Sequence, residues 1–168
     1  DGLPVPARDV TVDAAGMVVF VGRLSKEKNP DGLLRAWKLA IPNLPTGWKL
    51  ALVGDGPMRA ELEVFIDNER LRDSVFLAGL QSNVESWLGA ADVYVLASHR
   101  EGLSNTLLEA MASGIPVVTT RLGIEGIKAI PNIHVLTSES SDGLANAVLK
   151  LKEPGLYKTI IYNAQKLI

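Results

Sequence analysis

Short apolar, β-branched runs alternate with stretches of helical spacing, and this alternation constrains the fold more than any other feature of the chain. The runs occupy residues 17–21, 50–53, 75–77, 93–96 and 116–119, with a sixth candidate at 134–136. Their continuous hydrophobicity is typical of strands that are covered on both faces. Strands that alternate with helices at this spacing require crossover connections and a parallel sheet. We therefore predict a Rossmann-like, doubly wound α/β domain of about six parallel strands with helices on both faces.

The stretches between the runs carry the apolar stripe of helices that lie on a sheet. The first opens at Pro30, a residue favoured in the first helical turn, and its apolar residues recur at three- and four-residue spacing. These residues are Leu33, Leu34, Trp37 and Ala40. Further helices are expected up to about residue 68, through residues 87–88, over 106–113 and 141–152, and in the amphipathic tail after Pro154.

Size and composition favour one folded domain preceded by a lead-in. The chain has 168 residues, of which 47% are hydrophobic, so it is long enough to bury a core. Residues 1–16 are polar and contain proline, and we expect them to be a linker from a missing N-terminal domain, with the folded domain spanning 17–168. The net charge of −2 gives no reason to expect nucleic acid as a partner. No apolar run approaches the roughly 20 residues that span a bilayer, and we expect a cytoplasmic protein.

Ligands of doubly wound sheets bind beyond the carboxyl ends of the strands, so the loops there are where functional residues should gather. Arg23 and Lys28 lie five residues apart on the first such loop. Two cations at this position could bind a diphosphate, with help from the partial positive charge of the following helix N-terminus. The alternative is that both are solvated surface charges, which is the usual state of a lysine-rich turn.

Glycines follow the second and third strands. Gly54 and Gly56 permit a tight turn and close approach of the backbone to a ligand, although a turn that serves packing alone is an equal alternative. The pair lacks the third glycine of the dinucleotide-binding fingerprint, and the chain has no glycine-rich loop ending in Gly-Lys-Ser or Gly-Lys-Thr. A nicotinamide site and a triphosphate-cradling loop are therefore disfavoured.

A polar loop enters the helix that carries Glu109. Ser104 and Asn105 are both suitable N-caps, and the free N–H groups at the start of that helix can donate to phosphate or sugar oxygens. The carboxylate of Glu109 could accept hydrogen bonds from two vicinal hydroxyls, such as those of a ribose. Glu101, just outside the helix, could face the sugar. The alternative is that Glu101 favours the helix dipole and that Glu109 is solvated.

Taken together, these segments resemble glycosyltransferase family 4. The resemblance covers residues 17 to about 126 and centres on a Glu-x7-Glu motif formed by Glu101 and Glu109. The other matching segments are residues 20–24 with Lys28, 52–57, 75–79, 91–98, 101–102, 108–112 and 114–118. The resemblance implies one half of a GT-B fold, in which two Rossmann-like domains face each other and the C-terminal one holds the sugar nucleotide.

The resemblance also implies roles for individual residues. Arg23, Lys28 and Glu101 would be the catalytic residues, with Arg23 and Lys28 on the diphosphate and Glu101 on the donor sugar. The base would rest near Gly79 and Leu80. The implied donor-binding residues are Gly22, Gly54, Gly56, Gly79, Leu80, Gly102, Leu103, Ser104, Asn105 and Glu109.

Two departures from the family pattern concern the same loops. Many relatives have an aromatic residue and then a glycine where this chain has Leu103 and Ser104, so its contacts with the donor sugar could differ. After the fifth strand, relatives usually show a Gly-Gly pair followed by Glu, and residues 121–126 keep only part of that pattern. The role of Glu125 is therefore left open.

The activity implied is transfer of a sugar from a UDP- or GDP-type donor to an acceptor hydroxyl, with retention at the anomeric carbon. The acceptor would be a glycan, a lipid or a small molecule bound by the missing domain, through which the protein could associate peripherally with a membrane. The chain alone would bind donor but be inactive. No cofactor is expected, and no metal, because the sequence has no Asp-x-Asp and its two histidines lack partners at metal-ligand spacing. The alternatives are a non-catalytic nucleotide-sugar-binding module and half of another GT-B enzyme, such as a sugar-nucleotide epimerase or a phosphorylase-like protein.

Overall fold

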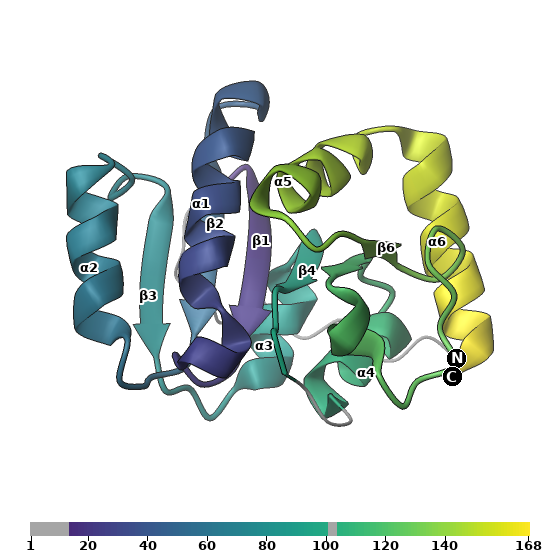
Figure 1. Ribbon diagram of the computed structural model, residues 1–168. Coiled ribbons are helices and arrows are strands. Elements are labelled where there is room, and N and C mark those ends of the chain that lie inside the picture. The colour runs from purple at the N-terminus through teal and green to yellow at the C-terminus, as the bar shows by residue number, and fades with distance from the viewer. Residues whose placement is uncertain (1–13, 101–103) are drawn as a thin grey trace.

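The computed structural model describes residues 14–100 and 104–168, which form a single sheet with helices around it (Figure 1). The strands are β1 (Gly16–Val21), β2 (Trp48–Val53), β3 (Val75–Gly79), β4 (Val93–Leu96), β5 (Val117–Thr119) and β6 (Leu136–Thr137). The α-helices are α1 (Pro30–Ala40), α2 (Arg59–Asn68), α3 (Val84–Ala90), α4 (Asn105–Ala112), α5 (Ser141–Lys150) and α6 (Pro154–Leu167). Short 3-10 helices are η1 (Lys26–Lys28), η2 (Ile41–Asn43) and η3 (Arg121–Ile124).

The sheet has six strands in the order β3-β2-β1-β4-β5-β6, and the named pairs are all parallel. The order reverses direction between β1 and β4, where the chain crosses from one side of the sheet to the other. This topology confirms the predicted doubly wound, Rossmann-like fold. Because the pairs are parallel, the strands point toward the same edge of the sheet, and the arrowheads of β1 and β3 mark it at the bottom of Figure 1. We call it the carboxyl edge, and the opposite one the amino edge.

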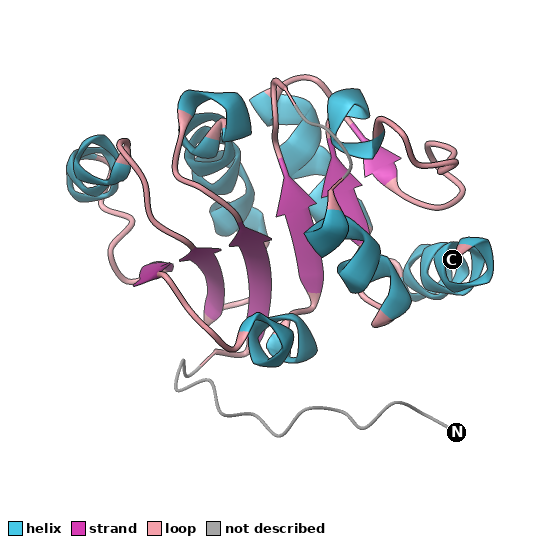
Figure 2. Cartoon of the chain, turned by 90° about the horizontal axis from the view of Figure 1, so that it is seen from below, coloured by secondary structure: helices cyan, strands magenta, loops and turns pink. Residues whose placement is uncertain are grey.

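Helices cover both faces of the sheet, as predicted (Figure 2). The alternation of side chains along β1 shows the two layers. Val18 and Phe20 belong to the large core cluster that includes Trp37 of α1, whereas Met17 and Val19 pack with Trp87 of α3 on the other face. Each of these side chains is at most 4% exposed. Burying one such apolar side chain contributes roughly 1.5–3 kcal/mol, so both layers stabilise the sheet.

Helix α1 follows its predicted pattern closely. Asn29 precedes it with a left-handed backbone (φ 53°), and its side chain accepts a hydrogen bond from the Gly32 N–H. Pro30 occupies the first turn, and the predicted apolar stripe is buried. At the other end of the helix, the Trp37 indole N–H donates to the Ser74 hydroxyl at 3.0 Å, which joins α1 to the start of β3.

Several boundaries differ from prediction: β2 begins at Trp48, β3 extends to Gly79 and β5 begins at Val117. Helix α4 starts one residue early, because Ser104 and not Asn105 is the N-cap, and it ends at Ala112. Strand β6 covers 136–137, since His134 lies in a turn in which its ring Nδ1 accepts the Ile130 N–H and its own N–H donates to the Ile130 carbonyl. Helix α5 ends at Lys150. Of the predicted lead-in, residues 1–13 lie outside the described part of the chain, and β1 begins at Gly16.

No helix among the described residues is both long and apolar enough to cross a membrane.

Candidate functional site

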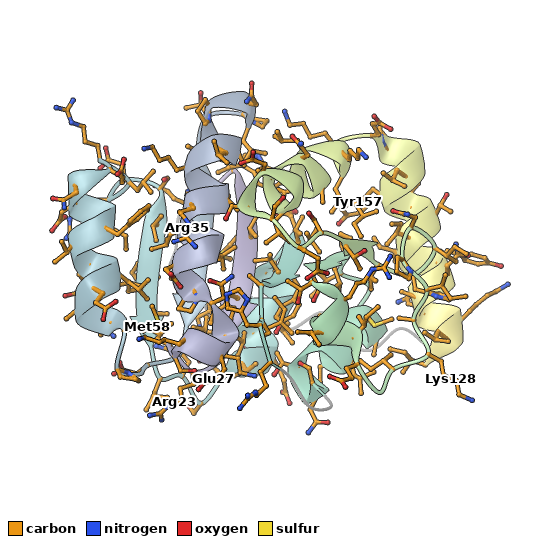
Figure 3. All side chains as sticks on the ribbon, viewed as in Figure 1. Arg23, Glu27, Arg35, Met58, Lys128 and Tyr157 are labelled. Atoms are coloured by element: carbon orange, nitrogen blue, oxygen red, sulfur yellow. The ribbon has the colours of Figure 1, made fainter. Side chains whose placement is uncertain are left out.

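The loops at the carboxyl edge contain the described members of the predicted site. In Figure 3, Arg23 and Glu27 lie side by side at this edge with Met58 close by, whereas Tyr157 lies near the opposite end of the molecule. The predicted residues come from the ends of β1, β2 and β3 and from the start of α4. Glu101, Gly102 and Leu103 lie outside the described residues.

Three of the predicted glycines meet directly. The Gly54 N–H donates to the Gly79 carbonyl at 2.8 Å, and the Gly22 N–H donates to the Val53 carbonyl at 2.9 Å. Gly54 has φ 141°, and a Cβ there would lie 1.9 Å from the Gly22 carbonyl oxygen. A side chain at position 54 is therefore excluded by the backbone of β1, whether or not a ligand is bound. The packing alternative given for this turn accounts for Gly54 by itself.

Packing also explains why position 56 is a glycine. A Cβ at this position would lie 2.5 Å from the Leu24 carbonyl oxygen. The loops after β1 and β2 are also joined by hydrogen bonds from the Leu24 N–H to the Asp55 carbonyl and from the Met58 N–H to the Leu24 carbonyl, at 3.0 and 2.9 Å. The loop that carries Arg23 is thus held against the loop between β2 and α2.

Arg23 and Lys28 both lie on this first loop, and they differ in exposure. The Arg23 side chain is exposed, whereas Lys28 ends η1 and is half-buried. Arg23 lines a concave pocket of about 350 Å³ whose other lining residues are Ser25, Lys26, Glu27, Pro57, Met58 and Glu61. Lys28 is absent from this lining, so the two predicted cations do not face the same hollow.

Glu27 is a residue that the sequence analysis left without a role. Its carbonyl accepts hydrogen bonds from the N–H groups of His99 and Arg100, at 2.8 and 3.4 Å. Hydrogen bonds to its own backbone and to Ser25, together with the positive charges of Arg100 and Arg23, hold the pKa of its carboxyl below the ordinary value. Glu27 therefore links the loop after β1 to the loop after β4, and it is an anion among the cations of this edge.

The start of α4 presents polar groups at the same edge. The Ser104 hydroxyl accepts the Leu107 N–H at 3.3 Å, which satisfies one of the free N–H groups of the first turn. Asn105 and Glu109 are exposed, and their side chains make no hydrogen bond or ion pair with the residues that the structure describes. Glu109 lies about one turn into α4, where it is available to a ligand that approaches the helix N-terminus.

The region assigned to the base has a large apolar side chain in solvent. Gly79 has φ 70°, and the Leu80 side chain that follows it is 82% exposed. Earlier in β3, Phe76 is 44% exposed and stacks on the ring of Trp87, with 6.0 Å between the ring centroids. A flat aromatic ligand could contact Leu80 without displacing any side chain of the core.

Buried polar residues behind the site were missed by the sequence analysis. Thr119, Thr120 and Ser98 are at most 4% exposed at the ends of β5 and β4. The Thr120 hydroxyl donates to the Ser98 carbonyl at 2.7 Å, and the Thr119 hydroxyl donates to the Thr120 carbonyl at 3.0 Å. The available signal was a pair of threonines directly after an apolar strand, where a polar pair must find partners inside the protein.

Within residues 14–100 and 104–168, no three His, Asp or Glu side chains gather closely enough to hold a metal ion. Glu125, whose role the sequence left open, is exposed at the end of η3.

Known proteins are similar to this chain in both sequence and fold. Residues 15–153 match the family described as glycosyl transferases group 1. The lipopolysaccharide core biosynthesis glycosyltransferase LpsD of Rhizobium meliloti (strain 1021) is 35% identical over 153 residues, which cover 89% of this chain and 43% of that protein. The sulfoquinovosyl transferase SQD2 of Arabidopsis thaliana is 35% identical over 128 residues, covering 76% and 22%. The chain thus spans less than half the length of these relatives.

Solved structures give the same result. The C-terminal domain of a glycosyl transferase group 1 family protein (LpcC) from Francisella tularensis has a TM-score of 0.86 at 24% identity, covering 93% of this chain and 85% of that one. Anabaena Alr3699/HepE in complex with UDP-glucose has a TM-score of 0.79 at 25% identity, covering 89% and 43%. Since the family match extends over most of the chain, this protein belongs to the glycosyl transferases group 1 family and has a domain fold of the GT-B type.

Proposed function

We propose that this domain binds the nucleoside diphosphate sugar of a retaining, hexosyl-transferring enzyme of glycosyltransferase family 4. The observation that carries the proposal is the arrangement of the carboxyl edge, where two cations, an exposed apolar side chain and a helix N-terminus lie on loops of a group 1 family member. A nucleotide sugar has matching parts, namely a diphosphate, a flat base and hydroxyl groups.

Each part of the donor has proposed partners. Arg23 and Lys28 would bind the diphosphate, and Leu80 with the backbone of Gly79 would contact the base. Glu109 would accept hydrogen bonds from the ribose hydroxyls. The N–H groups near Ser104 and Asn105 would donate to the donor sugar, next to Glu101, whose role is proposed from the sequence. The HepE complex with UDP-glucose supports a uridine nucleotide as the first ligand to test.

The proposed reaction breaks the bond between the anomeric carbon and the diphosphate oxygen and forms a bond to the oxygen of an acceptor hydroxyl, whose proton is taken up by the released diphosphate. Negative charge grows on the diphosphate as its bond breaks. Cations held in place beforehand stabilise that charge more than they stabilise the intact donor, and this difference lowers the barrier. Arg23 and Lys28 would supply this stabilisation. The proposal includes no metal and no cofactor.

The acceptor site is proposed to lie on a second, N-terminal domain of the protein. The small share of LpsD that this chain covers supports this division, because most of that relative lies beyond the matching region. The present chain would then bind donor without turning it over.

Isothermal titration of the chain with UDP, GDP and ADP tests the proposal. We expect at least one nucleotide to bind, and the double substitution Arg23→Ala and Lys28→Ala to weaken binding by about tenfold or more, the effect of removing charge-assisted hydrogen bonds. A matched control is Arg35→Ala with Lys38→Ala, which removes the same charge from exposed positions of α1. Equal effects of the two double substitutions, or no binding of any nucleotide, would sink the proposal.

A further inference from the structure

Three loops of the carboxyl edge are joined to one another by hydrogen bonds within the protein, separate from the contacts proposed for the nucleotide sugar. They follow β1, β4 and β5, and they meet through Glu27, Ser98 and Thr120. From this arrangement we infer that Thr120 is a positioning residue, which holds residues 98–100 and, through them, the turn that carries Lys28. The consequence for ligand binding rests on the proposed function, whereas the positioning itself is a property of the free protein.

Thr120 can hold Ser98 in place because its hydroxyl both donates and accepts a hydrogen bond. It donates to the Ser98 carbonyl at 2.7 Å and accepts the Gly123 N–H at 3.3 Å. The side chain is 4% exposed, so water does not compete readily for either partner. The Thr120 N–H also donates to the Leu96 carbonyl at 3.1 Å, which continues the pairing of β4 with β5. The hydroxyl thus fixes the first residues after β4 to the end of β5.

The next link runs from the β4 loop to the cation turn. Directly after Ser98, the N–H groups of His99 and Arg100 both donate to the Glu27 carbonyl, at 2.8 and 3.4 Å. Glu27 is the central residue of η1, and Lys28 follows it. A displacement of Ser98 would therefore move the donors that hold η1. Cations contribute most to binding when they are held in place before the ligand arrives, and Thr120 would provide part of this preorganisation.

Hydrogen exchange tests the positioning without any ligand. In the unsubstituted protein we expect protection of the His99 and Arg100 amides. Thr120→Val replaces the hydroxyl with a methyl of similar size, and we expect about tenfold faster exchange of these two amides. Thr120→Ser, which keeps the hydroxyl, should restore protection. Thr119→Val is the matched control, since it removes an equally buried hydroxyl one residue away that donates to the Thr120 carbonyl.

Titration with UDP tests the consequence. We expect Thr120→Val to weaken UDP binding by about three- to tenfold, the effect of losing one buried hydrogen bond, with the affinity of Thr120→Ser close to that of the parent. In a Lys28→Ala background, Thr120→Val should cause little further loss, because the two residues would act through the same turn.

The results separate the inference from the proposed function. Unchanged protection of His99 and Arg100 in a folded Thr120→Val protein overturns the inference, and so does equal loss of protection in Thr119→Val. Should Thr120→Val fail to fold, the same amides in Thr120→Ala decide in its place. Absence of UDP binding by the parent protein would contradict the proposed function alone, since the exchange result stands without it.

Discussion

The amino and carboxyl edges of the sheet differ in how far their polar groups are engaged within the fold. At the amino edge, polar groups hold elements of the fold together: the Asp92 carboxylate accepts the Met17 N–H at 2.8 Å, and the Trp37 indole donates to Ser74. At the carboxyl edge, Asn105 and Glu109 have no partner among the described residues. Groups that serve the fold are engaged already, and groups left exposed at one edge are the ones available to a ligand.

Within the carboxyl edge itself, the glycines serve the fold, whereas an exposed side chain such as Glu109 is available to a ligand. Gly54 and Gly56 are fixed by contacts with the backbone after β1, so their identity gives no information about a ligand. No contact among the described residues explains why position 109 is a glutamate. Function at this edge is therefore best tested at exposed side chains, and stability at the glycines.

The largest expected effect is on the glycine turn. Gly54→Ala would force a positive φ on a residue with a side chain and press its Cβ against the Gly22 carbonyl. We expect the free energy of unfolding to fall by about 3 kcal/mol, measured by urea denaturation. The control is Gly155→Ala on α6, where an added Cβ meets no atom within 4 Å and stability should not fall. A similar result for both substitutions would contradict the packing explanation.

The next effect concerns the amino edge. Asp92→Ala removes the acceptor of the Met17 N–H and should lower the free energy of unfolding by about 1.5 kcal/mol, while the affinity for UDP stays unchanged. Denaturation and titration of the same sample measure the two quantities. Asp73→Ala, which removes an exposed carboxylate, should stay within about 0.5 kcal/mol of the parent. Weaker UDP binding by a folded Asp92→Ala protein would contradict the claim that polar groups at the amino edge serve the fold alone.

The smallest effect on stability is expected at Glu109. Glu109→Ala should leave the free energy of unfolding within about 0.5 kcal/mol of the parent, because the side chain is exposed, and weaken UDP binding by about tenfold. Glu153→Ala, an exposed carboxylate on the turn before α6, should change neither quantity. Loss of folding in Glu109→Ala would instead assign this residue a structural role.

The sequence was sufficient to predict the fold because buried parallel strands leave a strong local signal. The runs around Val19 and Val95 are apolar throughout, and the helices between them carry clear stripes. The local sequence pattern did not predict element boundaries where a side chain hydrogen-bonds to the backbone. His134 extends an apolar run and reads as strand, but its ring accepts a backbone N–H and closes a turn. Ser104 and Asn105 are equally good N-caps in sequence, and only the geometry of α4 distinguishes them.

The candidate site was predictable in its location, since strand ends can be read from the sequence, but not in its internal contacts. The reason for glycine at position 54 is the Gly22 carbonyl, which lies far away along the chain. The role of Thr120 depends on Ser98, 22 residues earlier. Such pairs come together only when the strands are ordered in the sheet, and one sequence by itself does not reveal that order.

The hydrogen bonds described between η1 and the β4 loop are made by main-chain atoms, with the Glu27 carbonyl on one side and the His99 and Arg100 amides on the other. Substitution of the side chains at positions 27, 99 and 100 themselves leaves these hydrogen bonds in place, provided that the new residues at 99 and 100 are not proline. Positions 27, 99 and 100 are therefore free to drift during evolution while the frame of the edge keeps its shape. Substitutions at these positions could therefore change the charge presented to a ligand of the proposed site without altering the loops that carry them.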